Sequence, residues 1–357
     1  MIPEKRVLIK RTLPLLLIGL LVFIAYLYFF VDINEMIAVV KGINLFYFSL
    51  AVVVLLLDAV FYSLTWQYFL RPISVKVPFR KTLMFTWIGA FVDILVPAES
   101  ISGDTTKAYL TSKESGKNAG KVVASVVSHR ILSIAITLSS LIIGSLWLVT
   151  SQYKLPAPVL NLILLVVAGT SISLVFLFLL CFKGQLTQKI IDSLLRFLAF
   201  VLRGRLRLTS LRFKTRKALR AFHESIEILS KNPRSLVLPV VFSLVSWLLS
   251  VLLSFLVFVS LGHPIHFVVI MIVSPIAGCI QNIPIGVPGE VGLIEFTMTE
   301  LYAALCFPLW GISLLEAKRI SAAATILIRA LTVWLTFFIG FMAAQWVGIK
   351  ALVSDSR

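Results

Sequence analysis

The sequence predicts an all-α polytopic membrane protein: one integral membrane domain over 1–357, with six full spans plus short re-entrant or broken helices in two inverted repeats. Hydrophobic residues make up 59% of the 357 residues, and the mean hydropathy is +1.01. Charged residues make up 14%, against roughly 25% in ordinary soluble domains. This composition excludes soluble enzymes, disordered chains and collagen-like fibres. The net charge of +17 indicates cytoplasmic loops beside anionic lipid rather than nucleic-acid binding.

Six apolar runs are long enough to cross a bilayer, which takes about 20 helical residues. They occupy residues 13–31, 45–70, 120–149, 159–182, 236–261 and 320–348. The first run follows a group of basic residues, as the apolar core of a signal peptide does. It is too long for such a core, and no small-residue cleavage motif follows it. We therefore expect it to be the first spanning helix.

Two further apolar segments are too short or too interrupted to be simple spans. The segment 83–97 ends at a proline, and 267–283 runs into a proline- and glycine-rich stretch before another apolar run at 291–306. Short apolar segments broken by Gly and Pro are typical of discontinuous or re-entrant helices. We expect 83–97 to be re-entrant, and the other two to form a broken pair that starts and ends outside.

Loop charge gives the predicted orientation. The loop at 183–235 carries thirteen Lys or Arg residues and three Asp or Glu residues. Strongly basic loops stay in the cytoplasm, so we expect this loop and both termini on the cytoplasmic side of the cell membrane. The loops at 32–44 and 150–158 carry one Lys each and fit the outside. This orientation requires that 83–97 turn back instead of crossing.

The basic loop is predicted to contain two amphipathic helices. Apolar residues recur at helical spacing at Ile190, Ile191, Leu194, Leu195 and Leu198, and again at Leu219, Phe222, Ile226 and Leu229. Helices of this kind lie on a membrane surface, where their basic side faces lipid headgroups. We expect 183–235 to contact anionic inner-leaflet lipid; the alternative is that its charge only fixes the topology.

The two halves of the chain, 13–149 and 236–348, share an order of features that predicts an internal repeat. Residues 96–99 read Val-Pro-Ala-Glu, and residues 287–290 read Val-Pro-Gly-Glu, each after a short apolar helix. In the predicted topology the two halves run in opposite directions. Inverted repeats with broken helices are typical of transporters whose substrate site lies between the repeats. A duplication retained only for stability is the alternative.

Each repeat continues with an acidic residue and then a helix with one buried arginine. The arginines are Arg130 and Arg329, and one in an apolar helix costs at least ~2.5–3.5 kcal/mol, so it should be paired or face a wet cavity. A guanidinium suits a phosphate or a carboxylate, and we expect both arginines to hold a lipid headgroup. Further candidates for this site are Lys107, Asp104, Glu99, Glu290 and Glu295. The alternative is an internal ion pair between each arginine and one of these acids.

Turns that carry proline and glycine separate the short helices and are predicted to act as gates. They include Pro97, Gly103, Pro284, Pro288, Gly289 and Gly292. Backbone N–H groups at the helix starts after such turns form ready anion sites. No catalytic, metal-binding or cofactor-binding pattern accompanies them, so we expect no enzyme activity, no metal and no cofactor.

These motifs, in their order, resemble a known family. The run Pro97…Gly103-Asp104-x-x-Lys107-Ala-Tyr-Leu, then Arg130, then Pro288-Gly289-x-x-Gly292-x-x-Glu295, then Arg329, is similar to the flippase-like transmembrane domain of lysyl-phosphatidylglycerol synthases, the multiple peptide resistance factors. The resemblance covers nearly the whole chain and implies an α-helical membrane fold that moves or handles lipids. His129 and Glu290 depart from the family pattern, which affects the expected headgroup charge. The aminoacyl-transfer domain is missing from this sequence, so that activity is not implied.

We therefore expect a flippase-like protein that translocates or handles a phospholipid, an aminoacyl lipid or a polyprenyl-phosphate-linked lipid. Its expected partners are membrane lipids and not nucleic acid. The alternative is a non-transporting accessory subunit that binds lipid, a membrane glycosyltransferase or a lipid-synthesis enzyme. Since the sequence has no ATP-binding motif, transport is expected to be passive or coupled to an ion gradient through acids such as Glu99 and Glu295.

Overall fold

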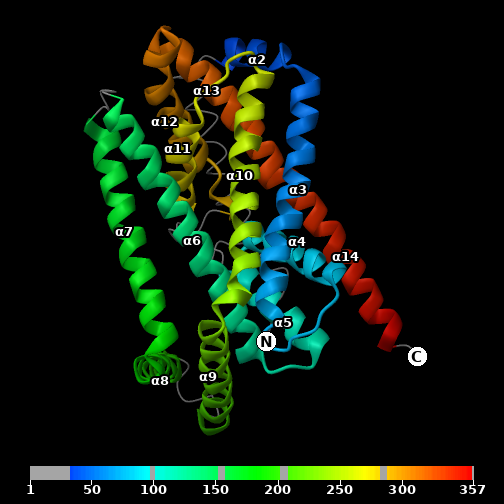
Figure 1. Cartoon of the computed structure of the whole chain (residues 1–357). Coiled ribbons are helices and arrows are strands. Elements are labelled where there is room, and N and C mark those ends of the chain that lie inside the picture. Colours follow the sequence, from blue (N-terminus) through cyan, green and yellow to red (C-terminus); the bar gives the residue numbers. More distant parts are fainter. Residues whose placement is uncertain (1–32, 97–100, 152–156, 202–207, 282–287, 356–357) are drawn as a thin grey trace.

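The structure, a computed structural model, describes residues 33–96, 101–151, 157–201, 208–281 and 288–355. All regular secondary structure within these residues is helical (Figure 1). The elements are α2 (Ile33–Lys41), α3 (Leu45–Leu70), α4 (Phe79–Leu95), α5 (Ile101–Ser115), α6 (Ala119–Thr150), α7 (Ala157–Phe182), α8 (Gly184–Val201), α9 (Leu208–Lys231), η2 (Pro233–Leu236), α10 (Val237–Ser260), α11 (Phe267–Gln281), η3 (Pro288–Glu290), α12 (Leu293–Trp310), α13 (Leu314–Arg329), η4 (Ala330–Leu335) and α14 (Thr336–Asp355). The predicted all-α class is confirmed.

Five helical stretches in the described part of the chain are long and apolar enough to cross a membrane. They are Leu45–Leu70, Ala119–Thr150, Ala157–Phe182, Pro233–Ser260 and Leu314–Val347. Each coincides with one of the predicted spans, and the protein is a multi-pass membrane protein. The remaining predicted span, at 13–31, lies outside the described residues. The short helix α2 falls in the segment 32–44, which was expected to be a loop.

The spans begin at residues whose side chains satisfy free backbone N–H groups. Asn44 accepts a hydrogen bond from the N–H of Phe46 at 3.0 Å at the start of α3. Asn118 does the same for Gly120 at 2.8 Å at the start of α6. Both caps compensate donors that lack a partner within the first helical turn. They fix where α3 and α6 start.

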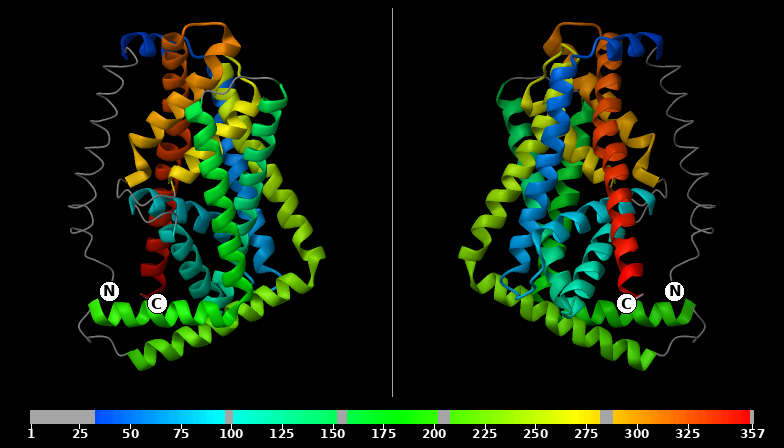
Figure 2. Two further views of the ribbon diagram at one scale, coloured as in Figure 1. Left: turned by 90° about the vertical axis from the view of Figure 1, so that its left-hand side faces the viewer. Right: turned by 90° about the vertical axis from the view of Figure 1, so that its right-hand side faces the viewer.

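The short helices form two packed pairs, α4 with α5 and α11 with α12. The two pairs lie toward opposite ends of the bundle: α4 and α5 near the end that carries α8 and α9, and α11 and α12 near the other (Figures 1 and 2). α4 corresponds to the predicted short segment 83–97, and α11 and α12 to the predicted broken pair.

Helices α8 and α9 lie across one end of the bundle (Figure 2). Both lie within the predicted basic amphipathic segment, and on α9 the apolar stripe packs against the protein. Phe222 and Ile226 are buried in a cluster with Ala124 of α6 and Cys181 of α7. Protein, and not lipid, covers this stripe. The pattern alone cannot distinguish these two partners, because both are apolar.

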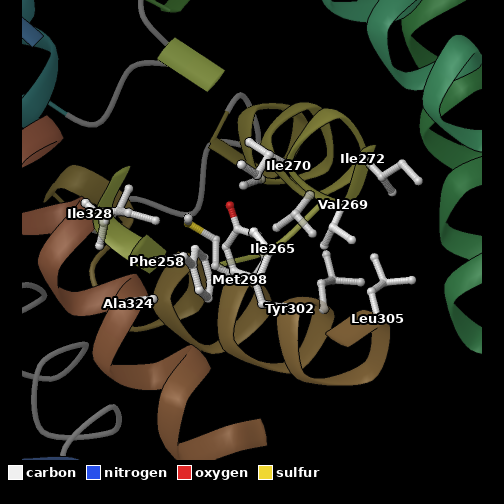
Figure 3. Packing of buried hydrophobic residues seen from close by; sticks show 14 of the residues in the cluster. Phe258, Ile265, Val269, Ile270, Ile272, Met298, Tyr302, Leu305, Ala324 and Ile328 are labelled. Carbon is white, nitrogen blue, oxygen red and sulfur yellow. The ribbon is translucent and has the colours of Figure 1, made fainter. Parts of the chain in front are cut away.

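The largest core cluster gathers residues of α10–α13 together with parts of α3, α6 and α7. Figure 3 shows its centre, where the rings of Phe258 and Tyr302 meet edge to face with centroids 4.9 Å apart. Both side chains are fully buried. This dense packing ties α11 and α12 to the long spans.

The last predicted span, 320–348, is not one uninterrupted α-helix. It begins earlier, at α13, where Ser313 accepts a hydrogen bond from the N–H of Glu316 at 3.2 Å. Immediately after Arg329 the backbone changes to the π-helical segment η4, and α14 follows. Such π segments within α-helices are found frequently at functional sites.

Candidate functional site

A cavity of about 280 Å³ lies where α3, α4, α5 and α6 meet η4 and the start of α14. Five acidic or basic side chains line it: Asp58, Asp93, Asp104, Lys107 and Arg130. Aromatic, small and hydroxyl side chains complete the wall. Charged groups are expensive inside a membrane protein and generally face one another or a wet cavity. Their convergence on one cavity makes it the candidate site.

Lys107, Asp104 and Arg130 form a charge cluster on one side of the cavity. The Lys107 ammonium lies 2.7 Å from one oxygen of Asp104, and Arg130 approaches the other oxygen at 3.8 Å. The ammonium is also 5.5 Å from the ring centre of Tyr62 and 5.6 Å from that of Trp66, a range in which aromatic faces attract cations. The Lys107 side chain is therefore fixed, whereas Arg130 keeps about a third of its side chain exposed, at 32%.

Rings behind this cluster hold α3 against α6. The rings of Tyr62 and His129 have centroids 4.3 Å apart. The indole N–H of Trp66 donates a hydrogen bond to the hydroxyl of Ser125 at 3.1 Å. Arg130 follows His129 directly, so these contacts set the rotation of α6 that turns Arg130 toward the cavity.

Asp93 positions α5 by satisfying donors at its N-terminal end. One oxygen of its carboxylate accepts hydrogen bonds from the N–H of Gly103 at 2.6 Å and from the hydroxyl of Ser102 at 2.7 Å. A carboxylate at a helix N-terminus is favourable, because the N–H groups there carry partial positive charge. A side chain at Gly103 would collide with Asp93 and with the carbonyl of Gly89 on α4. Glycine is therefore required for α4 and α5 to pack this closely.

Asp58 lies apart from the charge cluster, near the middle of α3. Its carboxylate accepts a hydrogen bond from the hydroxyl of Ser246 on α10, the helix against which α3 packs most extensively. Neither Asp58 nor Asp93 was among the residues predicted for the site. The signal that could have found Asp58 is an acid thirteen residues into an otherwise apolar span.

Arg329 and Glu295 form a second, separate group of charges. The guanidinium lies 2.7 Å from the carboxylate and also donates a hydrogen bond to the carbonyl of Gly289. The other carboxylate oxygen accepts the N–H of Gly292 at 2.6 Å. Both side chains are buried, and neither lines the cavity. In this structure Arg329 is thus engaged within the protein rather than open to a ligand.

The structure therefore divides the predicted site residues into two groups. Arg130, Lys107, Asp104 and Gly103 come together at the cavity or beside it. The others that are described lie at the second group: Arg329, Glu295, Glu290, Pro288, Gly289 and Gly292. Pro97, Glu99 and Pro284 lie outside the described residues.

The two groups are linked through η4. Gly289 lies against Ile94 of α4 and Val333 of η4. The neighbouring Thr332 of η4 and Thr336, the first residue of α14, line the cavity. Gly289 and Glu290 have positive φ angles of 63° and 48°, so the turn bends sharply here. A movement of this turn would reach the cavity through η4.

Comparison with known proteins places this architecture in a family. The model of the lysylphosphatidylglycerol synthase TM region matches residues 16–340. The chain belongs to this family. The predicted resemblance is confirmed, and the match covers both charge groups, four of the five described spans in full and most of the fifth.

Curated relatives of this family member have similar length. The chain is 24% identical over 350 residues to a UPF0104 membrane protein of Pyrococcus horikoshii, which covers 96% of this chain and 98% of the relative. It is 24% identical over 308 residues to a UPF0104 membrane protein of Methanothermobacter thermautotrophicus, which covers 85% of this chain and 86% of the relative. A third, from Methanocaldococcus jannaschii, is 22% identical over 343 residues, covering 94% of each chain. No solved structure matches this chain.

Proposed function

We propose that the protein binds the charged headgroup of a membrane lipid in the cavity and carries that lipid between leaflets, without a chemical reaction. The observation that carries this proposal is the position of Arg130, with Lys107 beside it, on a cavity inside the membrane domain. Arg130 lies eleven residues after the start of α6, about 16 Å along the helix at 1.5 Å per residue. A guanidinium at that depth can hold a phosphate group with two parallel hydrogen bonds.

The proposed orientation puts α8 and α9 in the cytoplasm of a cell-membrane protein. The C-terminal end of α14 lies at the same end of the bundle as α8 and α9 (Figure 1), which supports a shared cytoplasmic location of this terminus and the basic loop. The N-terminus, outside the described residues, is proposed on the same side. In this orientation α4 and α5 enter from the cytoplasm and return, and α11 and α12 do so from outside.

The exposed face of α9 supports contact with anionic lipid. Arg216, Lys217 and Arg220 are exposed on this helix, while Phe222 and Ile226 pack inward. Basic residues close to a membrane surface gain about 1 kcal/mol each from anionic headgroups. We therefore propose that α9 attracts inner-leaflet lipid through charge alone and not by inserting an apolar stripe.

Two corresponding acid–arginine pairs support the inverted repeat. Asp104 lies in the first turn of α5 and approaches Arg130 at 3.8 Å; Glu295 lies in the first turn of α12 and meets Arg329 at 2.7 Å. In both halves, therefore, an acid in the first turn of a short helix contacts the arginine of a later helix. In an inverted-repeat transporter, the two halves exchange conformations around the substrate.

The two pairs differ in tightness, and this difference suggests a mechanism. The pair in the second half is buried and closed, whereas Arg130 is partly exposed on a cavity. We propose that this conformation receives a lipid on the side of α4 and α5. Closing the first pair and opening the second would then present the headgroup to the other leaflet.

Reconstitution into liposomes tests the proposal. Purified protein is incorporated with trace fluorescent lipids of differing headgroup, and the fraction of each lipid accessible to a membrane-impermeant quencher is followed over time. The expected result is faster exchange between leaflets than in protein-free liposomes, for some headgroups and not others. Headgroup-selective binding without exchange would contradict transport and leave the non-transporting accessory role. Neither binding nor exchange would overturn the proposal altogether.

A further inference from the structure

The cavity holds more negative than positive groups. Three carboxylates (Asp58, Asp93 and Asp104) and two cations (Lys107 and Arg130) line it. A site made only for an anionic phosphate would be expected to carry the opposite balance. The partners of each carboxylate show which of them is left for a ligand.

Two of the three carboxylates have strong partners. Asp104 is paired with Lys107 and approached by Arg130. Asp93 caps α5 by accepting the N–H of Gly103. Asp58 accepts one hydrogen bond, from the neutral hydroxyl of Ser246. Among the described residues, no cationic nitrogen lies within ion-pair distance of Asp58.

An isolated carboxylate at this depth is costly. Asp58 lies thirteen residues into α3, about 20 Å from its start at 1.5 Å per residue, which is near the centre of a span. Acids at such positions normally face a wet cavity and pair with a cation. The described residues supply the cavity but no cation paired with Asp58, so a ligand that carries a positive charge would complete the pairing.

The geometry points to one ligand that carries both charges, and we infer that the cavity takes a zwitterionic headgroup with an amine and a phosphate. Tyr62 follows Asp58 by one helical turn, about 6 Å along α3, and its ring lies 5.5 Å from the Lys107 ammonium. Asp58 and Lys107 thus line the same cavity, and each lies close to Tyr62 along its wall. The amine would bind Asp58 beside Trp87, which lines the same cavity and whose ring attracts cations. The phosphate would bind at Arg130.

This inference rests on the proposed function, and ligand-side changes can test it without altering the protein. Binding to the detergent-purified full chain is measured for three short-chain lipids with identical tails: phosphatidylethanolamine, its N-acetylated form and phosphatidylglycerol. All three carry the phosphate, and only the first carries the amine. We expect the first to bind about tenfold more tightly than the other two, as loss of one charged hydrogen bond predicts.

The Asp58→Asn variant tests whether Asp58 causes the preference for the amine-bearing lipid. It keeps the size of the side chain, and its amide oxygen can still accept from Ser246, but it lacks the negative charge. We expect it to bind phosphatidylglycerol as the wild type does and to lose the tenfold preference for the amine. Ser246→Ala, which keeps the charge, should retain the preference. A variant that weakens all three lipids equally would contradict an amine site.

The outcomes separate this inference from the proposed function. Equal wild-type binding of all three lipids would overturn the amine site and leave headgroup binding intact. Absence of binding to any of them would overturn the proposed function itself. Free phosphoethanolamine is a fourth arm: if it binds as tightly as the lipid, the amine–phosphate chemistry is supported but the ligand is a water-soluble molecule, which contradicts the proposed lipid.

Discussion

Arg329 and Glu295 form an ion pair 2.7 Å long between side chains that are only 5% and 7% exposed. The same two residues hold the turn before α12, because Arg329 donates to the carbonyl of Gly289 and Glu295 accepts from the N–H of Gly292. The pair thus fastens a sharply bent turn to the end of α13.

Removing one partner of this pair is expected to lower the stability of the protein. Arg329→Ala leaves the Glu295 carboxylate buried without its cation, a change that typically costs 3–5 kcal/mol, so about that loss is expected. The measurement is thermal unfolding of the purified protein in detergent. The double variant Arg329→Met with Glu295→Gln, which leaves no buried charge, should recover much of the loss.

An exposed ion pair provides the control. Lys231 and Glu227 on α9 are 2.6 Å apart but 74% and 61% exposed, and water screens such pairs. Lys231→Ala is therefore expected to cause no measurable change in unfolding temperature. A similarly small effect of Arg329→Ala would show that the buried pair does not fasten the turn.

The close packing of α4 and α5 leads to a second prediction. A methyl group at Gly103 would overlap the Asp93 carboxylate and the carbonyl of Gly89, and forced overpacking typically costs about 1–3 kcal/mol. Gly103→Ala should lower the unfolding temperature and weaken lipid binding together, because α5 carries Lys107 into the cavity. Gly169→Ala is the matched control.

Gly169→Ala is the same substitution as Gly103→Ala, but in surroundings that leave room for the added methyl group. Gly169 lies within α7, and a methyl group there meets no atom within 4 Å. Alanine favours a helix over glycine by up to about 1 kcal/mol, so Gly169→Ala should be neutral or slightly stabilising. Equal destabilisation by both variants would refute the steric explanation for Gly103.

Labelling of single cysteines tests the proposed orientation. After replacement of native Cys181, Cys279 and Cys306, one cysteine is placed at Ser230 of α9 or at Thr150 near the other end of the bundle; both positions are exposed. In intact cells, an impermeant thiol reagent should label the Thr150→Cys variant and not the Ser230→Cys variant until the membrane is permeabilised. Labelling of Ser230→Cys in intact cells would reverse the orientation and remove the reason for a re-entrant α4.

Much of this architecture could be predicted because its signals are local. Apolar length alone placed the five described spans, since a bilayer dictates how long such helices must be. The pairing of Glu295 with Arg329 was among the alternatives, because a buried guanidinium in this setting requires an anion. Which of the two arginines stays open to the cavity could not be predicted, because both have the same local sequence pattern.

The remaining features depend on contacts between distant segments. Asp58 belongs to the site because α10 brings Ser246 to it and α4 and α5 close the cavity around it. Phe222 and Ile226 are buried because α9 folds back against α6 and α7. The amphipathic pattern of α9 would be equally compatible with lipid. The spacing of residues along α3 does not identify Ser246 as the partner of Asp58. The spacing along α9 likewise does not show which segment covers Phe222 and Ile226.

The last prediction separates a phosphate-binding role of Arg130 from a structural one. Arg130→Lys keeps the positive charge but loses the planar fork that binds two phosphate oxygens at once. We expect lipid exchange in liposomes to fall about tenfold, the equivalent of 1.4 kcal/mol. The unfolding temperature should change little, because the side chain is about a third exposed and lysine keeps the positive charge beside Asp104.

Two comparisons make this result specific to the cavity. Lys121→Gln removes a cation from the same helix at a position outside the cavity, and exchange should remain normal. Arg329→Lys alters the buried pair, so it should lower stability more than the exchange rate of the folded protein. Near-normal exchange by Arg130→Lys would mean that its guanidinium does not clamp a phosphate. Arg130 would then be, like Arg329, a structural partner of the acid in its own repeat, and the accessory role would become the better account of the cavity.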